Sequence, residues 1–260
     1  MKISFSKYQG AGNDFVLIDD RPCTFPQDVD LIKKICNRRF GIGADGLILL
    51  QNDNKTDFKM VYFNADGNLG SMCGNGGRCV VAFAKALYVI DKSCSFAAYD
   101  GIHQASINDA NQVKLHMSDV GSIDKRLEGV FLDTGSPHLV CFQQGVEDLD
   151  VDSVGARIRY SSSYKEIGTN VNFAERIDDY LLLRTYERGV EAETLACGTG
   201  ATATAIAAFE EGLFDTKYIK LKVKGGHLEV SFEPKGNSYS NICLTGPAEF
   251  VFSGEIEINV

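Results

Sequence analysis

The sequence of 260 residues contains no tryptophan and only four histidines, and it lacks a long apolar run. No window approaches the roughly 18 apolar residues that a membrane-spanning helix needs, and the first residues lack the apolar core of a signal peptide. The formal net charge is -9, without a clustered Lys/Arg stripe, which argues against a nucleic-acid or anionic-membrane surface. We therefore expect a cytoplasmic globular protein with neither nucleic acid nor membrane as a partner.

Eight cysteines are present, but no two have the Cys-x-x-Cys spacing, and the histidines are scattered. The common zinc motifs are therefore missing, and we expect no metal site. In a cytoplasmic chain most cysteines are buried small apolar residues. We assign to the core Cys36, Cys79, Cys94, Cys141 and Cys243, and to a loop Cys23. Two cysteines, Cys73 and Cys197, differ from the rest.

These two cysteines mark an internal repeat with an offset of 124 residues. At this offset Cys-Gly-Asn-Gly (73–76) aligns with Cys-Gly-Thr-Gly (197–200), and Gly46 aligns with Asn170. A stretch of helix formers that is apolar on every side follows each motif, at 76–90 and 200–209, which is typical of a buried helix. Short apolar runs such as 15–18 and 139–142 indicate strands. We predict an α/β protein of two pseudo-symmetric halves, each a mostly antiparallel sheet wrapped around a buried central helix.

The boundary between the halves is expected between Ser118 and Ile123, which gives an N-terminal half of residues 1–118 and a C-terminal half of residues 119–247. Three polar segments, 51–55, 147–152 and 234–240, are expected to be loops or turns. None of them is long enough to be a flexible linker.

Both motifs place a thiol at a glycine-rich turn directly before a helix. Glycine lets the backbone approach a ligand closely, and a helix start offers unpaired N–H groups and a partial positive charge. Such a position binds anions and lowers a thiol pKa. Two such turns facing one another predict a stereoinversion, in which one thiolate removes an α-proton and the opposite thiol supplies one to the other face.

Two other interpretations of the motifs stay open at this point. A single Cys-Gly-x-Gly is more typical of a structural turn, and two thiols that lie close together could be a redox pair. The occurrence of the motif at both positions of the repeat favours catalysis by Cys73 and Cys197.

Seven segments resemble the diaminopimelate epimerase family and together cover nearly the whole chain. They are residues 12–15, 41–46, 63–67, 72–79, 168–170, 186–189 and 193–200. The resemblance implies an active site in a cleft between the halves, with residues 248–260 returning to the first half as a final strand. It implies an isomerase of lysine biosynthesis that interconverts LL- and meso-2,6-diaminopimelate without pyridoxal phosphate, any other cofactor or metal. It also implies a homodimer.

The resemblance assigns a role to each site residue. Cys73 and Cys197 would be the acid/base pair, with His138 and Glu187 tuning their pKa values. The reacting carboxylate would be held by Gly74, Asn75, Gly198 and Thr199. The rest of the substrate would be recognised by Asn13, Asn64, Asn170, Glu187 and Arg188. A guanidinium suits a distal carboxylate, and amide and carboxylate oxygens suit ammonium groups.

Three positions depart from the family pattern: Ser136 stands where many members have Asn, Gly46 where some have Gln, and Phe252 where family dimers use Tyr. Two alternatives also remain. One is a proline racemase or hydroxyproline epimerase, whose first motif usually reads Cys-Gly-His, whereas Asn75 follows Gly74 here. The other is a non-catalytic binding relative of the same fold, which the presence of both cysteines disfavours.

Overall fold

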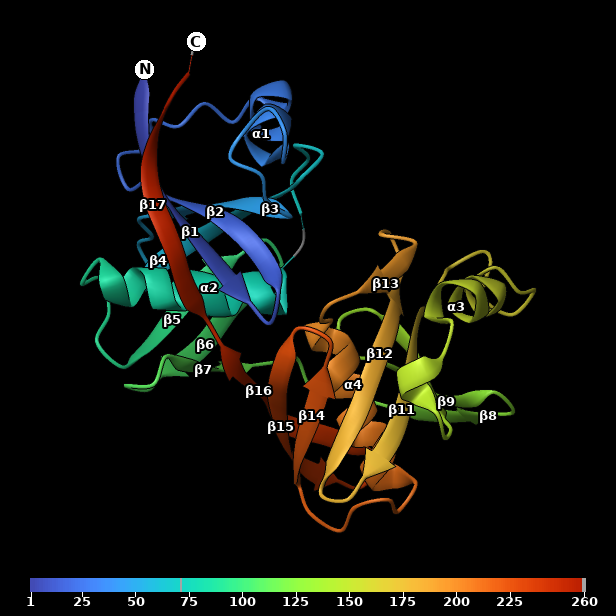
Figure 1. The fold of residues 1–260 in the computed structure, drawn as a ribbon. Helices are drawn as coiled ribbons and strands as arrows, with labels where there is room; N and C mark the ends of the chain where they lie inside the picture. Colours follow the sequence, from blue (N-terminus) through green and yellow to red (C-terminus); the bar gives the residue numbers. More distant parts are fainter. Residues whose placement is uncertain (71, 259–260) are drawn as a thin grey trace. The chain divides into compact units, whose positions relative to one another are not determined.

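The computed structural model describes residues 1–70 and 72–258 (Figure 1). The chain forms two compact units. The first unit contains Met1–Leu115 and the C-terminal segment that starts at Gly246, and the second unit contains His116–Thr245. Residues 259 and 260, the end of the expected final strand, lie outside the described residues.

The sheet of the first unit has the order β17-β1-β2-β3-β4-β5-β6-β7. Neighbouring strands are antiparallel, except for the parallel pairs β2/β3 and β4/β5. The final strand β17 lies alongside β1 (Figure 1). The strands are β1 (Lys2–Gly10), β2 (Asn13–Asp19), β3 (Gly46–Gln51), β4 (Phe58–Asn64), β5 (Ser93–Ala98), β6 (Gly101–Ile107), β7 (Gln112–His116) and β17 (Glu249–Glu257).

The second unit repeats this succession of pairings. Its order is β8-β9-β10-β11-β12-β14-β15-β16, with parallel pairs at β10/β11 and β12/β14, and the short β13 pairs with β12. The predicted two halves with mostly antiparallel sheets are therefore confirmed. The strands are β8 (Ile123–Arg126), β9 (Gly129–Asp133), β10 (Pro137–Phe142), β11 (Asn170–Ile177), β12 (Tyr180–Glu187), β13 (Ala192–Thr194), β14 (Tyr218–Val223), β15 (Gly226–Lys235) and β16 (Ser238–Pro247).

A buried helix lies inside the sheet of each unit: α2 (Gly74–Ala86) in the first and α4 (Gly198–Glu210) in the second, each of 13 residues. Helix α2 packs against strands from β1 to β6, and α4 against strands from β9 to β15. The predicted central helices are thus confirmed, but both begin two residues earlier than predicted. Glycine and asparagine are poor helix formers. The residues of the first turn therefore do not indicate a helix in the sequence, although they are helical in the structure.

The predicted end of the first central helix at Ile90 is wrong. Helix α2 ends at Ala86, because Tyr88 adopts a left-handed backbone with φ 58°. The N–H of the next residue, Val89, donates to the carbonyl oxygen of Ala84, which closes the helix with a Schellman-type turn.

Two further helices, α1 (Val29–Cys36) and α3 (Val151–Arg159), cover the other face of each sheet and were not predicted. Ile32 of α1 packs in a cluster with Val16 and Leu47, and Val151 of α3 packs in the corresponding cluster. The expectation of a loop at 147–152 is wrong, since this segment contains most of a 3-10 turn, η1 (Val146–Asp148), and the start of α3. No helix in the described part of the chain is long and apolar enough to span a membrane.

Candidate active site

The two cysteines occupy the same place in their units, directly before the central helices. Cys73 has φ -110° and ψ 120°, and Cys197 has φ -117° and ψ 113°, so each is an extended N-cap residue. The carbonyl oxygen of each cysteine accepts the first helical hydrogen bond, at 2.7 Å from the nitrogen of Gly77 and 2.9 Å from that of Ala201. Each thiol is therefore attached at the positive end of a buried helix.

Two predicted binding residues, Asn13 and Asn75, lie next to Cys73. Its Sγ lies 3.7 Å from Oδ1 of Asn13, and the Nδ2 group of Asn75 donates to the same oxygen at 3.2 Å. The Nδ2 group of Asn13 in turn donates to Asp45 at 2.7 Å, which fixes the orientation of its amide. Asn64 is exposed at the end of β4, where it pairs with Gly46.

Asp45 belongs to a network of four charged residues. Lys7, only 5% exposed, pairs with Asp14 at 2.7 Å, and Arg38 pairs with Asp14 and Asp45 at 2.7 and 2.6 Å. Burial alone would raise the pKa of Asp14, but the hydrogen bonds from Arg38 and Lys7 outweigh it and hold this pKa well below its usual value. The sequence reasoning missed this network, although Asp14 and Asp45 lie in two of the family segments.

Arg78 is a second residue that the sequence reasoning left without a role. Its side chain is fully buried within α2. The guanidinium donates to Oδ1 of Asn75 at 3.0 Å, to the carbonyl oxygen of Gly74 at 3.4 Å and to that of Pro247 at 3.3 Å. It thus holds the first turn of α2 from beneath. The available signal was a cation five residues after Cys73, in a helix whose other charged residue, Lys85, lies in the last turn.

Cys197 in the second unit is 7% exposed, and its Sγ lies 3.5 Å from Oγ1 of Thr199. The hydroxyl of Thr134 donates to the carbonyl oxygen of Thr199 at 3.0 Å and fixes this turn. A Cβ atom on Gly200 would lie 3.3 Å from the sulfur of Cys197 and 2.5 Å from Oδ1 of Asn172. Glycine at 200 is therefore required by close packing.

His138 lies fully buried on β10, between two hydrogen-bonding side chains. Nδ2 of Asn172 donates to Nδ1 of the ring at 3.1 Å, and Oγ of Ser136 lies 3.3 Å from Nε2. Burial, with a smaller contribution from the charge of Arg188, lowers the pKa of His138 to about 3. The ring is uncharged at neutral pH, and its proton sits on Nε2 because Nδ1 is an acceptor. Sequence reasoning missed Asn172.

The remaining predicted residues of the second unit lie around Asn170. Its Nδ2 group donates to Ser136 at 2.8 Å and to the carbonyl oxygen of Pro137 at 3.0 Å, and its Oδ1 accepts the backbone N–H of Arg188 at 2.9 Å. Glu187 accepts from the hydroxyl of Thr194 at 2.9 Å. The structure thus brings Asn170 and Arg188 together with Ser136, beside His138.

The strand registers show a difference between the two units at corresponding positions. Phe15 pairs with Gly46 in the first unit as His138 pairs with Asn170 in the second. Two residues further along β3 and β11, Ile48 pairs with Tyr62 of β4, whereas Asn172 pairs with Thr185 of β12. At these positions the second unit has a hydrogen bond from Thr185 to Asn172, whereas the first unit has the apolar side chain of Ile48 in place of Asn172.

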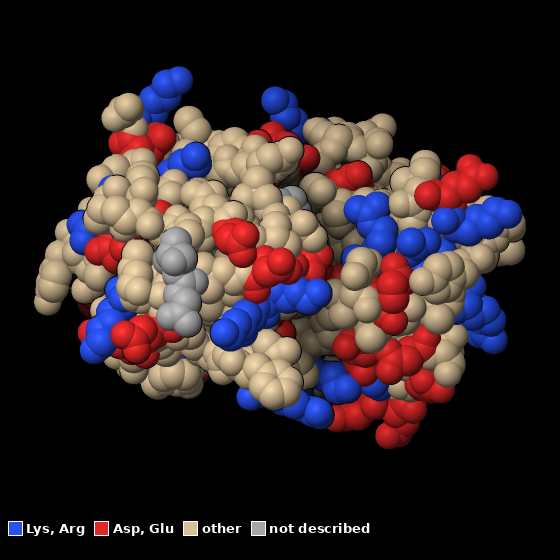
Figure 2. All heavy atoms as spheres, turned by 90° about the horizontal axis from the view of Figure 1, so that it is seen from above, with Lys and Arg blue, Asp and Glu red and all other residues tan. Residues whose placement is uncertain are grey.

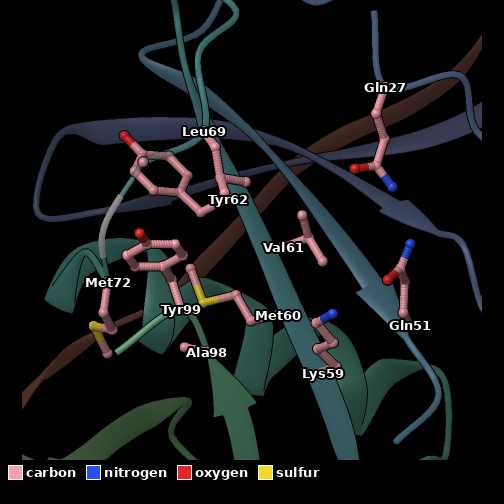
Figure 3. A pocket seen from close by; sticks show the side chains of 11 residues that line it. Gln27, Gln51, Lys59, Met60, Val61, Tyr62, Leu69, Met72, Ala98 and Tyr99 are labelled. Carbon is pink, nitrogen blue, oxygen red and sulfur yellow. The ribbon is translucent and has the colours of Figure 1, made fainter. Parts of the chain in front are cut away.

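A pocket of about 390 Å³ lies beside the half-site of the first unit. Figure 3 shows the rings of Tyr62 and Tyr99 on one side, with the amides of Gln27 and Gln51 on the other. Met72, which precedes Cys73, lines this pocket, whereas Cys73, Asn13 and Asn75 are not among its lining residues. Within residues 1–70 and 72–258, no three His, Cys, Asp or Glu side chains are grouped as a metal site requires.

Solved structures define the fold class. The chain is similar to a phenazine biosynthesis protein of the PhzF family from Bacillus anthracis, with a TM-score of 0.77 and 15% identity over 99% of this chain and 100% of that chain. A hydroxyproline epimerase from Agrobacterium vitis gives a TM-score of 0.70 and 12% identity over 98% and 92%. These similarities show a shared fold.

Sequence comparison defines the family more closely. The model of the diaminopimelate epimerase family matches residues 5–123 and 130–251. The diaminopimelate epimerase of Flavobacterium psychrophilum is 54% identical over 96% of this chain and 98% of that protein, and the one of Chlorobaculum tepidum is 42% identical over 96% and 99%. The chain belongs to the diaminopimelate epimerase family, as its sequence motifs predicted.

Proposed function

We propose that this protein interconverts LL- and meso-2,6-diaminopimelate with Cys73 and Cys197 as its two acid/base groups, as a step of lysine biosynthesis. The observation that carries the proposal is the equivalence of the two cysteines, each the N-cap of a buried 13-residue helix in units of the same topology. The family and the names of the most similar relatives support the substrate.

In the proposed reaction the two thiols flank one α-carbon. The thiolate of one cysteine takes the α-proton and becomes a thiol, while the thiol of the other gives its proton to the opposite face and becomes a thiolate. The N–H groups of Gly74, Asn75, Gly198 and Thr199 hold the α-carboxylate and stabilise the charge that develops on it. One proton leaves and one arrives, so configuration inverts without a redox change.

Recognition of the rest of the substrate is assigned to Asn13, Asn64, Asn170, Glu187 and Arg188. Support comes from fixed orientations: Asp45 and Asn75 set the amide of Asn13. The guanidinium of Arg188 suits the distal carboxylate of a diacid, which proline lacks.

We also assign His138 and Glu187 to tuning of the thiols. Because the imidazole of His138 is uncharged, it acts through hydrogen bonds and placement rather than through a positive charge. Asn172 links this ring to the first turn of α4, since its Oδ1 approaches Gly200.

A homodimer formed through β17 and a cytoplasmic location complete the proposal. Phe250, Val251 and Phe252 of β17 are 55%, 52% and 45% exposed, which is a large apolar surface for one strand. The ring of Phe252 packs edge-on against Phe5 at 5.9 Å and is held in place. A reducing compartment would keep both thiols reduced. On the face in Figure 2, basic and acidic side chains are interspersed, and we propose neither nucleic acid nor membrane as a partner.

The test is an epimerisation assay on reduced, purified protein without added cofactor. LL-diaminopimelate, L-proline and trans-4-hydroxy-L-proline are supplied separately, and the stereoisomers are resolved by chiral chromatography. We expect turnover of diaminopimelate alone. Turnover of proline or hydroxyproline alone would refute the substrate, and absence of turnover on all three would refute the enzyme assignment.

A further inference from the structure

Arg78 is a fully buried cation whose hydrogen-bond acceptors are all neutral. Among the residues that the structure describes, no carboxylate forms an ion pair with it. Buried charges in proteins are normally paired, because removing a charge from water is costly. The position of Arg78 therefore indicates that an anion forms nearby when the protein works.

The groups that could carry negative charge and whose charge acts on Arg78 are the thiols of Cys73 and Cys79. Burial raises the pKa of the Cys79 thiol far above its ordinary value, so this thiol stays neutral. Cys73 is partly exposed, and the guanidinium holds Gly74 and Asn75, the two residues that follow it. Cys73 is thus the group that Arg78 is placed to balance.

The charged network that orients Asn13 does not replace Arg78. Lys7 and Arg38 contribute two positive charges, and Asp14 and Asp45 contribute two negative charges, so the network sums to zero. It orients Asn13 but leaves the charge of Arg78 uncompensated.

The second unit has a neutral residue at the equivalent position. Thr202 follows Cys197 by five residues, as Arg78 follows Cys73, and its hydroxyl donates to the carbonyl oxygen of Gly198 at 3.0 Å. Thr202 thus makes the same kind of hydrogen bond to the first turn of α4 as Arg78 makes to that of α2, but Thr202 carries no charge. His138 beneath this turn is uncharged, and the charged residues at the end of β12, Glu187 and Arg188, are one of each sign.

We propose that Arg78 is a positioning residue that supplies the counter-charge for Cys73, so that Cys73 is the thiolate and Cys197 the thiol in the substrate-free protein. The consequence for catalysis rests on the proposed function. In that reaction Cys73 is the base, and Cys197 the acid, towards the first substrate molecule that the protein binds. One contact opposes the ionisation of Cys73, since its thiol can donate to Oδ1 of Asn13 at 3.7 Å. A thiol is a weak donor, whereas a nearby opposite charge shifts an ionisation by about 1–3 pH units, so the charge prevails.

The test measures the rate of alkylation by iodoacetamide against pH, resolved for each cysteine by peptide mass spectrometry. Cys73 is followed in a Cys197→Ser protein and Cys197 in a Cys73→Ser protein, which removes coupling between the thiols. We expect the midpoint of Cys73 to lie at least about one pH unit below that of Cys197. A midpoint of Cys197 equal to or below that of Cys73 would overturn the proposal.

Three variants in the Cys197→Ser background separate charge from shape. Arg78→Met should raise the midpoint of Cys73 by about one pH unit or more, and Arg78→Lys should restore most of the shift. Thr202→Val, the matched change in α4, should leave it unmoved. If Arg78→Met does not fold, the proposal is still tested by the midpoint of Cys73 in the Arg78→Lys protein and by the comparison of the Cys73 and Cys197 midpoints.

Equal midpoints for the Met and Lys variants would reduce Arg78 to a packing role and overturn the proposal. The measurement needs no substrate. A protein that fails to turn over diaminopimelate would contradict the proposed function and leave this result standing.

Discussion

Asn172 donates a hydrogen bond to Nδ1 of His138 across 3.1 Å, and both side chains are fully buried. The same asparagine accepts from the hydroxyl of Thr185 at 3.0 Å and donates to the carbonyl oxygen of Leu139 at 3.1 Å. Its amide is therefore locked, with the oxygen directed to the first turn of α4 at Gly200. This layer connects three strands to the N-terminus of the helix that follows Cys197.

Replacing Asn172 by leucine should destabilise the protein by about 2–4 kcal/mol, because His138, Thr185 and the Leu139 carbonyl each lose a buried partner. Thr185→Val removes one bond and should cost about 1 kcal/mol. Urea unfolding followed by circular dichroism measures both. Equal stability of wild type and Asn172→Leu would mean that the layer contributes nothing to the fold.

The buried ring of His138 should make stability depend on pH. Its folded pKa of about 3 lies below the unfolded value of about 6.5. The unfolded chain thus binds the extra proton, and the stabilisation present above pH 6.5 is lost as pH falls towards 3, by about 1.4 kcal/mol per pH unit. In His138→Gln, the unfolding free energy should fall less steeply between pH 6.5 and 4. The exposed His227, changed to Gln, is the control and should leave the slope unaltered; an unchanged slope in His138→Gln would contradict the neutral ring.

Gly200 and Gly76 hold the same position in the two helices but should respond differently to alanine. At Gly76 the added Cβ meets side-chain ends of Ile48 at 3.1 Å and Met60 at 3.3 Å, which can shift. At Gly200 it meets the locked amide oxygen of Asn172 at 2.5 Å and the sulfur of Cys197 at 3.3 Å. We expect Gly200→Ala to lower kcat by about tenfold or more by displacing the thiol, and Gly76→Ala to lower it less. Steady-state kinetics check this ordering, and the reverse order would count against it.

Cys73→Ser and Cys197→Ser should each cut epimerisation by about 10²–10⁴-fold, because a hydroxyl is a far weaker acid than a thiol and is hardly ionised at neutral pH, so it neither donates nor accepts the proton well. The fold should persist, since the change is nearly isosteric, and circular dichroism checks this. Cys23 is exposed, and Cys23→Ser should keep full activity. Normal turnover by the double Cys73→Ser, Cys197→Ser protein would exclude the two-thiol mechanism.

The repeated architecture and the position of both cysteines before the central helices could be predicted from the sequence, because both depend on local sequence patterns. An apolar stretch after Cys-Gly marks a buried helix wherever it lies in the chain. The outer helices were missed for the opposite reason. Helix α1 is short and depends on the cap by Asp28, whose carboxylate accepts from the nitrogen of Leu31 at 2.9 Å, and on packing of Ile32 against the sheet.

The roles of Arg78 and Asn172 could not be predicted from one sequence. Arginine and asparagine are usually exposed, and nothing in the local pattern shows that these two are completely buried. Burial converts Arg78 into an unpaired charge and Asn172 into a locked amide, and it makes His138 neutral. These properties arise from tertiary packing of strands that are far apart in the sequence.

The exchange of two different protons at one carbon is tested most directly in heavy water. Reduced protein is mixed with unlabelled LL-diaminopimelate in deuterium oxide, and both isomers are recovered at low conversion for mass spectrometry. With separate thiols on the two faces, the meso product should carry one deuterium at the inverted carbon, while the remaining LL isomer carries almost none. Deuterium appearing in the LL isomer as fast as in the product, or a product without deuterium, would contradict the account.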